Sequence, residues 1–524
     1  MIKPNWLEKA VFYNIYPQSF YDSNNDGIGD LNGICQKLDY IFDMGYTALW
    51  LNPFYESPFN DAGYDVTDYY KVAKRYGTID DFKNLCNEAH KKGIKVCIDL
   101  VAGHTSMECE WFKKSAEAEK NEFSNRYIWT DSWMKGNTPE FIGGFGNRNG
   151  QYMKNFFYCQ PALNYGFANI DDPSWQLPPE HPDCIATKNE LLNIIDFWIN
   201  AGADGFRVDM APSLIKNDYD GSGIKKFWNG IRKVFDEKYP ECVLISEWSD
   251  PKAAIPAGFH IDFLIHCVLP AYTKLFRAEK GRSINDLFLG HTFFDKDGNG
   301  NIEDFLSDYL NEYEKTKDIG YISIPTGNHD LQRISYKRDK DDLECVYAFI
   351  MTMPGVPFVY YGDEIGMEYI KDIPSKEGGF ERTGSRTPMQ WKNGKNAGFS
   401  EADSDMLYLP VNENGVNVES QAADDNSLLN TMKRLIALRK SEKALSADGK
   451  IEFLNRRYGG YPLIYKRTAE DSEYIICINP SGKNQEFEYD FSKFKVKMQN
   501  KSARIDDSKI TLPEASFVIL TKCK

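Results

Sequence analysis

Eight short apolar stretches recur along this 524-residue chain, and each has the length and composition of a β-strand. They span residues 10–17, 46–53, 94–101, 203–210, 242–248, 260–266, 320–327 and 356–362. Amphipathic helix patterns lie between them, and two of these, 79–93 and 188–202, end at a glycine, which is a usual helix C-cap. Alternating strands and helices predict a parallel sheet with right-handed crossovers. Eight such units predict an α/β fold built on a closed (β/α)8 TIM barrel.

One connection between these units is too long for a loop. After the strand at 94–101 the next long helix pattern begins near Ala186, and the segment between them is rich in Asn, Gly, Pro and aromatic residues. A structureless loop of that length is improbable, so an inserted subdomain is predicted. Beyond the helix pattern at 427–441 the apolar period changes to two, which predicts an antiparallel β-sandwich domain. The predicted domains are a barrel in two parts (1–103 and 179–445), the inserted subdomain (104–178) and the C-terminal domain (446–524).

Charge and composition restrict the partners of such a chain. It has 62 Lys and Arg against 77 Asp and Glu, a net charge of −15, which argues against nucleic acid and anionic membranes and is compatible with a neutral small-molecule substrate. No window reaches the roughly 18 apolar residues that span a bilayer. The first residues lack a signal-peptide pattern, and the 11 cysteines have no metal-like spacing, so a reduced cytoplasmic protein is expected, as a monomer or weak homo-oligomer.

The strand at 203–210 carries two charged residues that an ordinary buried strand would not have. Arg207 and Asp209 are two positions apart, so their side chains share a face. Burying a charged pair has a desolvation cost. One interpretation is a structural ion pair, and the other is an ionised nucleophile held by its counter-charge.

Other polar residues follow the predicted strands where a TIM barrel places its active site, at the carboxyl ends. Asp99 and His104 follow the third strand, Glu247 the fifth, and Asn328, His329 and Asp330 the seventh. Two carboxylates flanking a bond are what glycoside hydrolysis requires. We expect Arg207 to lower the pKa of Asp209 and keep it ionised. We expect Trp248 and the neighbouring acids to raise the pKa of Glu247, which suits a general acid.

The sequence resembles the α-amylase family of glycoside hydrolases over nearly its whole length. The stretches that carry this resemblance are DLVAGH (99–104), GFRVD (205–209), SEW (246–248) and GNHD (327–330). Within the family it is most similar to the oligo-1,6-glucosidase and α-glucosidase branch. The stretches similar to that branch are YPQSFYDSNNDGIGDLNGI (16–34), NPFYESPFNDAGYDVTDY (52–69), QPALNY (160–165), VYYGDEIGM (359–367) and RTGSRTPMQW (382–391).

The resemblance implies roles for particular residues. Asp209 would be the nucleophile of a retaining reaction, Glu247 the acid/base, and Asp330 the group that binds the sugar 2- and 3-hydroxyls. The residues implied to bind substrate around them are His104, Arg207, His329, the stacking ring of Tyr64, and a pair formed by Asp61 and Arg386 that closes the pocket around a non-reducing end. The implied activity is exo-hydrolysis of short α-1,4- or α-1,6-glucosides. The alternatives are transglycosylation or isomerisation of sucrose-like disaccharides, endo-acting amylase activity, and a catalytically silent relative.

Four positions depart from the family pattern. Gly103 stands where many amylases have an Asn that helps to hold calcium, so that calcium site is not expected. Ala162 replaces an Asp of the branch. The stretch MAPSL after Asp209 lacks the Lys-His pair of many endo-amylases, which weakens the endo interpretation. Met210 occupies a position that helps to select the linkage and is neither of the usual residues, so the linkage stays open.

A structural calcium ion is predicted near the N-terminus. The stretch DSNNDGIGD places Asp22, Asn24, Asp26 and Asp30 at alternate or near-alternate positions, with the Ile28 carbonyl available, like the first half of a calcium loop. The resembling branch has calcium here, whereas the alternative is an Asx-rich turn. A second stretch, with Asp295, Asp297, Asn299 and Glu303, is better explained as an ordinary turn. No catalytic cofactor is expected, since glycoside hydrolysis of this type needs none.

Overall fold

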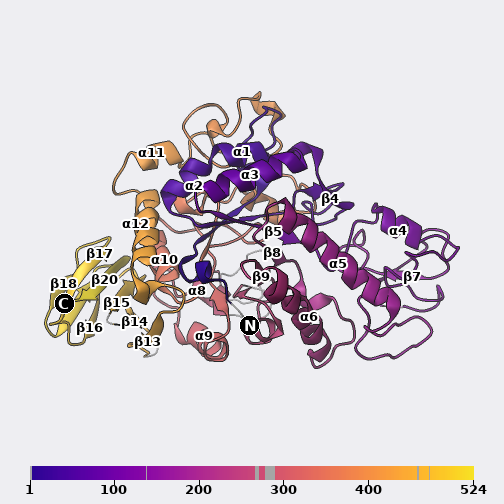
Figure 1. Ribbon diagram of the computed structural model, residues 1–524. Helices are drawn as coiled ribbons and strands as arrows, with labels where there is room; N and C mark the ends of the chain where they lie inside the picture. Colours follow the sequence, from indigo (N-terminus) through magenta and orange to yellow (C-terminus); the bar gives the residue numbers. More distant parts are fainter. Residues whose placement is uncertain are drawn as a thin grey trace.

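A computed structural model describes residues 3–136, 138–265, 271–277, 290–456, 459–470 and 472–523. Its centre is a barrel of eight parallel strands, and all eight coincide with stretches predicted from the sequence (Figure 1). They are β1 (Phe12–Ile15), β2 (Ala48–Leu51), β5 (Lys95–Leu100), β8 (Gly205–Val208), β9 (Val243–Ser246), β10 (Ile261–Phe263), β11 (Tyr321–Ser323) and β12 (Phe358–Tyr360). They are ordered β11-β10-β9-β8-β5-β2-β1-β12. Two backbone hydrogen bonds join the ends of this sheet, from Val356 N to Ile322 O (3.3 Å) and from Thr326 N to Phe358 O (2.9 Å).

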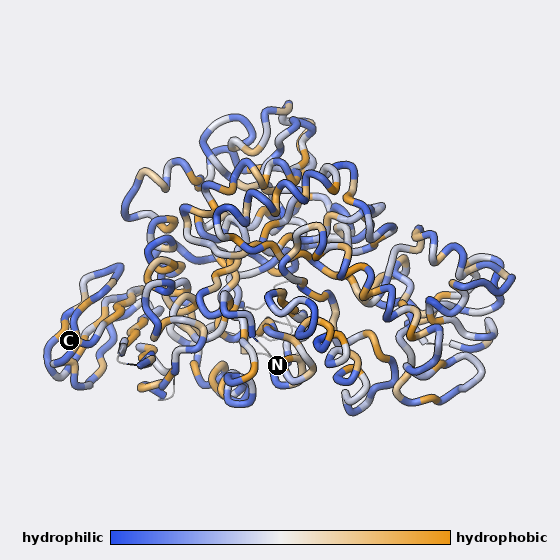
Figure 2. Tube along the Cα trace, viewed as in Figure 1, coloured by the Kyte–Doolittle hydropathy of each residue, from blue (hydrophilic) through white to orange (hydrophobic). Residues whose placement is uncertain are grey.

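Helices surround the barrel and cover its outer face (Figure 1). In α3 (Ile79–Lys91) the chain starts with a capping box between Thr78 and Asp81 and turns its apolar face inward. In α5 (Pro182–Ala201) it ends at Gly202, which has the left-handed conformation that glycine tolerates. The other helices against the barrel include α2 (Leu38–Met44), α6 (Ser222–Lys238), α7 (Pro251–Ala257), α9 (Glu303–Thr316), α10 (Lys340–Thr352) and α12 (Leu428–Ser441). Figure 2 shows the resulting pattern, with hydrophobic strands at the centre and hydrophilic outer helix turns.

The strand alternation decides which side chains enter the barrel. Trp50, Ile245 and Phe263 belong to one buried cluster inside it. Because side chains on a strand alternate between faces, Glu247 shares the inner face of Ile245, just past the end of β9. The barrel interior is therefore apolar along its strands and carries charged side chains at their carboxyl ends.

The long connection after β5 folds as the sequence predicted, into a small unit of its own. It contains α4 (Glu110–Ser115) and the antiparallel pair β6 (Phe141–Gly143) and β7 (Gln151–Met153). The rings of Phe112, Trp129 and Tyr152 pack together at its centre, with centroids 5.0 to 5.7 Å apart. In Figure 1 this unit projects on the side of the barrel away from the C-terminal strands.

The C-terminal part is an antiparallel β-domain, as the sequence predicted. One sheet has the order β13-β14-β15-β20-β17 and the other β16-β19-β18. The strands are β13 (Lys450–Phe453), β14 (Leu463–Ala469), β15 (Ser472–Asn479), β16 (Gln485–Glu488), β17 (Phe494–Gln499), β18 (Arg504–Asp506), β19 (Lys509–Leu512) and β20 (Ser516–Lys522). Buried Arg467 on β14 joins this domain to the barrel, because it donates to the carbonyls of Thr352 and Ser446.

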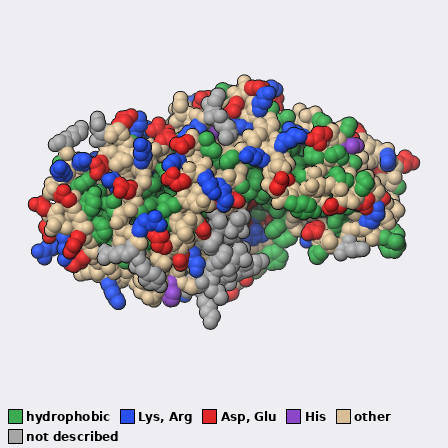
Figure 3. Space-filling view, turned by 90° about the horizontal axis from the view of Figure 1, so that it is seen from below, with side chains coloured by type: hydrophobic (Ala, Val, Ile, Leu, Met, Phe, Trp, Pro, Cys, Tyr) green, Lys and Arg blue, Asp and Glu red, His purple; other side chains and the backbone are tan. Residues whose placement is uncertain are grey.

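The surface carries mixed charge. Acidic and basic side chains are interspersed over the face shown in Figure 3. Among the described helices, none combines the length and apolar character that a membrane crossing requires.

Candidate active site

The buried guanidinium of Arg207 is the centre of the site. Asp99 and Arg207 are register partners on the neighbouring strands β5 and β8. One terminal nitrogen of Arg207 contacts Asp99 Oδ1 at 2.6 Å and Asp209 Oδ1 at 2.9 Å, and the other contacts Glu247 Oε1 at 2.6 Å. Three carboxylates from three strands therefore meet at one arginine. The ion pair expected between Arg207 and Asp209 is present, and it lies at the carboxyl ends of the strands, whereas the role of Asp209 as a nucleophile stays a prediction.

Glu247 is held from its other side by the backbone of the neighbouring strand end. Its Oε2 accepts a hydrogen bond from the Met210 amide at 3.0 Å, and its own amide donates to Val208 O at 3.1 Å. Met210 has φ +42°, a left-handed conformation that is strained for a side chain other than glycine. The chain immediately after Asp209 thus turns sharply, so that its amide points at the carboxylate of Glu247.

Burial, rather than Arg207, decides the direction of the Asp209 pKa. Desolvation raises the pKa of Asp209 to about 6, and the opposing effect of Arg207 is smaller. The expectation that Arg207 gives Asp209 a lowered pKa was therefore wrong, because burial and the neighbouring acids outweigh the effect of the arginine. Burial also raises the pKa of Glu247, with Arg207 opposing and Asp209 and Asp330 adding to the increase. The direction expected for Glu247 agrees, but its main cause is desolvation.

Asp330 has the opposite electrostatic setting. Its Oδ2 lies 3.0 Å from His329 Nε2, and its Oδ1 lies 2.7 Å from Arg382 and 3.1 Å from Arg386. Burial would raise its pKa, but His329 and the two arginines together hold the pKa well below its usual range. The ionised, hydrogen-bond-accepting form of Asp330 is therefore favoured, beside two carboxyls of raised pKa.

The pairing expected between Asp61 and Arg386 is not the one observed. Arg386 donates to His329 O at 2.9 Å and to Asp330. Asp61 accepts a hydrogen bond from Gln160 Nε2 at 2.7 Å and has Arg382 at 3.9 Å. Arg386 does not pair with Asp61 because its side chain is turned inward, toward the backbone of the loop that contains Asp330. Burial raises the pKa of Asp61 to about 6.

An aromatic wall stands beside these charges. The ring of Tyr64 is stacked on that of His329, with centroids 5.3 Å apart and an angle of 13°. Asn52 joins the two, with its amide nitrogen 3.2 Å from Tyr64 Oη and 3.0 Å from His329 Nδ1. Burial lowers the pKa of His329. The Tyr64 ring, for which the resemblance implies stacking on the sugar, is thus oriented by its contact with the His329 ring.

His104 lies on the rim formed by the inserted unit. Its Nδ1 is 3.1 Å from the side-chain amide of Asn155, and burial lowers its pKa to about 3. The ammonium of half-buried Lys216 contacts Asn155 Oδ1 at 3.1 Å. A side chain at Gly103 would collide with that Asn155 amide, 2.7 Å from an added Cβ. The Asn155 amide and the Ser213 hydroxyl, 3.1 Å from the added Cβ, therefore fill the place where the family pattern would have its calcium-binding Asn.

The predicted calcium loop is organised by its own acids. Asp22 accepts from the amides of Asn25 (2.7 Å) and Gly27 (2.8 Å) and from Ser400 Oγ (2.6 Å). The other predicted ligands bond within the loop as well: Asn24 Oδ1 accepts from the amide of Asp26 (3.0 Å), Asp26 Oδ1 from that of Ile28 (3.0 Å) and Asp30 from that of Gly33 (2.7 Å). Within the described ranges, no three His, Cys, Asp or Glu side chains are grouped so as to hold a metal ion. In this form the loop offers no shared ligand cage, and calcium binding here stays a prediction.

The second acidic loop is neutralised by basic residues. Asp295 pairs with Arg338 at 2.8 Å, Asp297 with His291 at 2.7 Å, and Glu303 with Arg456 at 2.7 Å. The amide of Asn299 donates to Asp297 Oδ1 at 3.0 Å. These contacts agree with an ordinary turn.

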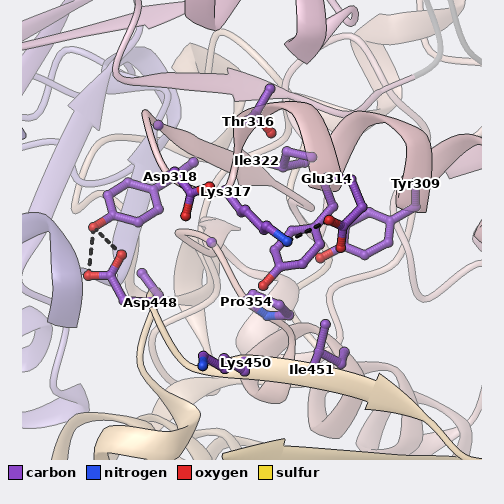
Figure 4. Close-up of a pocket in the computed structure, with 15 residues that line it drawn as sticks. Tyr309, Glu314, Thr316, Lys317, Asp318, Ile322, Pro354, Asp448, Lys450 and Ile451 are labelled. Carbon is purple, nitrogen blue, oxygen red and sulfur yellow. Dashed lines mark hydrogen bonds and ion pairs between the residues drawn. The ribbon is translucent and has the colours of Figure 1, made fainter. Parts of the chain in front are cut away.

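A cavity of about 350 Å³ lies elsewhere, between α9, the start of β11 and the C-terminal domain (Figure 4). Tyr321 donates to Asp448 across it, at 3.0 and 3.1 Å. Because β11 starts at Tyr321, this cavity is at the amino-terminal end of the strands. It is separate from the converging carboxylates.

Several site residues were not identified from the sequence. Each of these residues contacts a residue that was identified; they are Arg382, Asn52, Asn155 and Gln160. The signal for Arg382 was present, since the stretch 382–391 contains two arginines four residues apart. Asn155 lies in the inserted unit, where no periodic pattern fixes which side chains face the barrel.

Known proteins match nearly the whole chain. A family profile described as the alpha amylase catalytic domain matches residues 14–448. The trehalose synthase/amylase TreS of Mycolicibacterium smegmatis is 33% identical over 486 residues, which cover 84% of this chain and 77% of TreS. The oligo-1,6-glucosidase of Parageobacillus thermoglucosidasius is 31% identical over 559 residues, which cover 92% of each chain. An isomaltulose synthase mutant of Erwinia rhapontici NX5, solved with D-glucose, has a TM-score of 0.83 at 24% identity over 100% of both chains, which shows a shared fold.

Proposed function

The chain belongs to the α-amylase family of glycoside hydrolases, and from this premise we propose that it is a retaining α-glucoside hydrolase. Its substrates would be short α-1,4- or α-1,6-linked gluco-oligosaccharides, attacked from the non-reducing end. The observation that carries the proposal is the meeting of Asp209 and Glu247 at Arg207, with Asp330 paired to Arg382 and Arg386.

The proposed reaction uses the two carboxyls in turn. Asp209 attacks the anomeric carbon while Glu247 gives its proton to the glycosidic oxygen. The bond between the anomeric carbon and the glycosidic oxygen breaks, and the leaving sugar departs neutral. Glu247, now ionised, then takes a proton from water, and the hydroxide attacks the anomeric carbon and releases Asp209. The raised pKa of Glu247 favours its protonated form at the start of this cycle.

Charges around Asp61 support attack at a chain end. Asp61, Arg382, Asp330 and Arg386 form one connected group beside the Tyr64 ring. Such a group can hydrogen-bond the several hydroxyls of a terminal glucose. The stretch after Asp209 also lacks the Lys-His pair that many endo-acting relatives have.

A second candidate is an intramolecular isomerase. It is favoured by the 33% identity with a trehalose synthase/amylase. The first step would be the same, but the released sugar would attack the glucosyl-enzyme in place of water. The difference lies in how long that sugar stays beside Glu247.

Product analysis separates these activities. The purified protein is incubated with maltose, isomaltose, sucrose and maltoheptaose, and the products are resolved by length and linkage over time. The proposal expects glucose to be released first from the disaccharides, and shortening of maltoheptaose by one unit at a time. Early mid-length fragments would contradict exo action, and trehalose or an isomer of sucrose without free glucose would identify the isomerase.

A further inference from the structure

Asp262 is a buried carboxylate that the proposed reaction does not use. It is the middle residue of β10 and is fully inaccessible to solvent. Its neighbours Ile261 and Phe263 face the barrel interior. Because strand side chains alternate, the carboxylate points to the opposite face, toward the turn that follows β9.

This carboxylate binds the chain on both sides of Glu247. Its Oδ1 accepts from Ser246 Oγ at 2.5 Å and from the Trp248 amide at 3.1 Å. Its Oδ2 accepts from the Asp250 amide at 3.0 Å. The last residue of β9 and two of the residues that follow it are thus tied to the neighbouring strand by one side chain.

The turn needs such a tie, because its backbone is strained. Ser249 has φ +60°, in the left-handed region that residues other than glycine rarely adopt. Its amide also donates to Asp262. Without a buried acceptor at this point, three backbone amides of the turn would lose their partner, and a different turn would be favoured.

We propose that Asp262 is a positioning residue for Glu247, holding the turn so that the carboxyl of Glu247 faces the glycosidic oxygen. This inference rests on the proposed function, in which Glu247 is the proton donor. Contacts from Arg207 and the Met210 amide fix the outer end of the Glu247 side chain. Asp262 fixes the backbone from which that side chain extends.

Leaving-group dependence measures the alignment of a proton donor. A nitrophenyl α-glucoside needs almost no protonation to leave, whereas methyl α-glucoside needs a full proton transfer. The experiment compares kcat/KM on both substrates for the wild type, Asp262→Asn and Glu247→Gln. Asparagine keeps the shape but replaces one acceptor oxygen by an NH2 group, which cannot accept from the turn amides.

We expect Asp262→Asn to lose roughly 10- to 100-fold on methyl α-glucoside and less than about 3-fold on the nitrophenyl substrate. Glu247→Gln should give the same selectivity with larger losses. The matched control is Glu364→Gln, another fully buried carboxyl, which accepts from Tyr13 and Tyr40 and has no contact with the turn. It should show no selectivity.

If Asp262→Asn does not fold, Ser246→Ala tests the positioning role instead. This variant removes one hydrogen-bond donor to Asp262 and leaves the carboxylate in place. It should show the same selectivity at a smaller magnitude. Equal losses on both substrates for the Asp262 and Ser246 variants, beside a selective Glu247→Gln, would overturn the positioning role alone. A non-selective Glu247→Gln would overturn the proton donor, and with it the proposed function.

Discussion

Arg207 shows at the scale of one residue how a site can hold acids of different character. Its guanidinium is 1% exposed and touches three carboxylates. Asp99 also accepts from the Trp50 indole at 2.8 Å, and burial raises the pKa of Asp99 to about 6. One cation therefore serves three anions, and burial leaves all three carboxyls with raised pKa values.

Replacing Arg207 by Met should expose this dependence. Three buried carboxyls would lose their counter-charge, which costs about 3–5 kcal/mol of folding stability unless they take up protons. We expect Tm to fall and kcat/KM on maltose to drop by at least about 100-fold, a loss of about 2.7 kcal/mol of transition-state stabilisation. Calorimetry at pH 5 and pH 8 checks the cause, since the Tm deficit should be smaller at pH 5. A deficit that does not change with pH would contradict it.

Arg382 and Arg386 should differ in what they contribute. Arg386 is 2% exposed and bonded to the His329 carbonyl, whereas the side chain of Arg382 is 21% exposed and lies between Asp61 and Asp330. Arg382→Ala should raise KM for maltose about 10-fold with little change in Tm. Arg386→Ala should lower both kcat/KM and Tm. Steady-state kinetics with thermal unfolding of both variants would contradict this assignment if the two behaved alike.

At the scale of elements, the sequence predicts the barrel well because each strand is a short apolar run with a helix after it. The acids at strand ends follow from the same reasoning, since β5, β8 and β9 must end at the same rim. The partners of those acids do not follow. Whether Asp61 meets Arg382 or Arg386 depends on a loop with left-handed residues at Glu377 and Phe380, and no periodicity predicts such turns.

The electrostatic directions were only partly predictable from the sequence. The raised pKa expected for Glu247 is found, although burial is its main cause. For Asp209 the sequence shows the adjacent arginine but not the depth of burial, and burial dominates. Local charge patterns can be read from a sequence, whereas desolvation depends on the whole fold.

The loop from Asp22 to Asp30 carries a prediction of its own. Its carboxylates already accept backbone amides, but an ionised carboxylate has about four lone-pair sites, so these bonds do not exclude a cation. We expect Ca²⁺ at 100 times its Kd to add about 2.7 kcal/mol of stability. Tm measured with Ca²⁺ and with chelator checks this.

A matched pair of variants completes the calcium test. Asp26→Asn should abolish the effect of Ca²⁺ on Tm. Asp297→Asn, in the second acidic loop, should leave it intact, since Asp297 is paired with His291. Equal Tm values with Ca²⁺ and with chelator would instead establish an Asx-rich turn.

At the scale of the whole molecule, buried carboxyls make stability depend on pH. Burial raises the pKa of Glu364 to about 7. A raised folded-state pKa contributes stability that is complete below the unfolded value and is lost as pH rises through the folded value. His104 and His329 have lowered pKa values, and their opposing effect is confined to pH below about 6.5.

We therefore expect the contribution of Glu364 to stability to fall as pH rises from about 5 to about 7, by up to about 1.4 kcal/mol per pH unit. Calorimetric Tm of the wild type and of Glu364→Gln across this range provides the measurement, and the difference between the two proteins removes the effect of the histidines. The Tm of the wild type should fall relative to that of the variant, because the amide of the variant does not titrate. A Tm difference that does not change between pH 5 and pH 7 would contradict this account.

The central claim is that Asp209 forms a covalent bond to glucose, and trapping that bond tests it most directly. A 5-fluoro-α-glucosyl fluoride has a good leaving group and a slowed second step, so the glucosyl-enzyme should accumulate. Mass spectrometry of the intact protein should show one added fluoroglucosyl unit, and peptide mapping should place it on Asp209, with no adduct in Asp209→Asn. An adduct on another residue, or initial release of the β-anomer from maltose, would contradict the account.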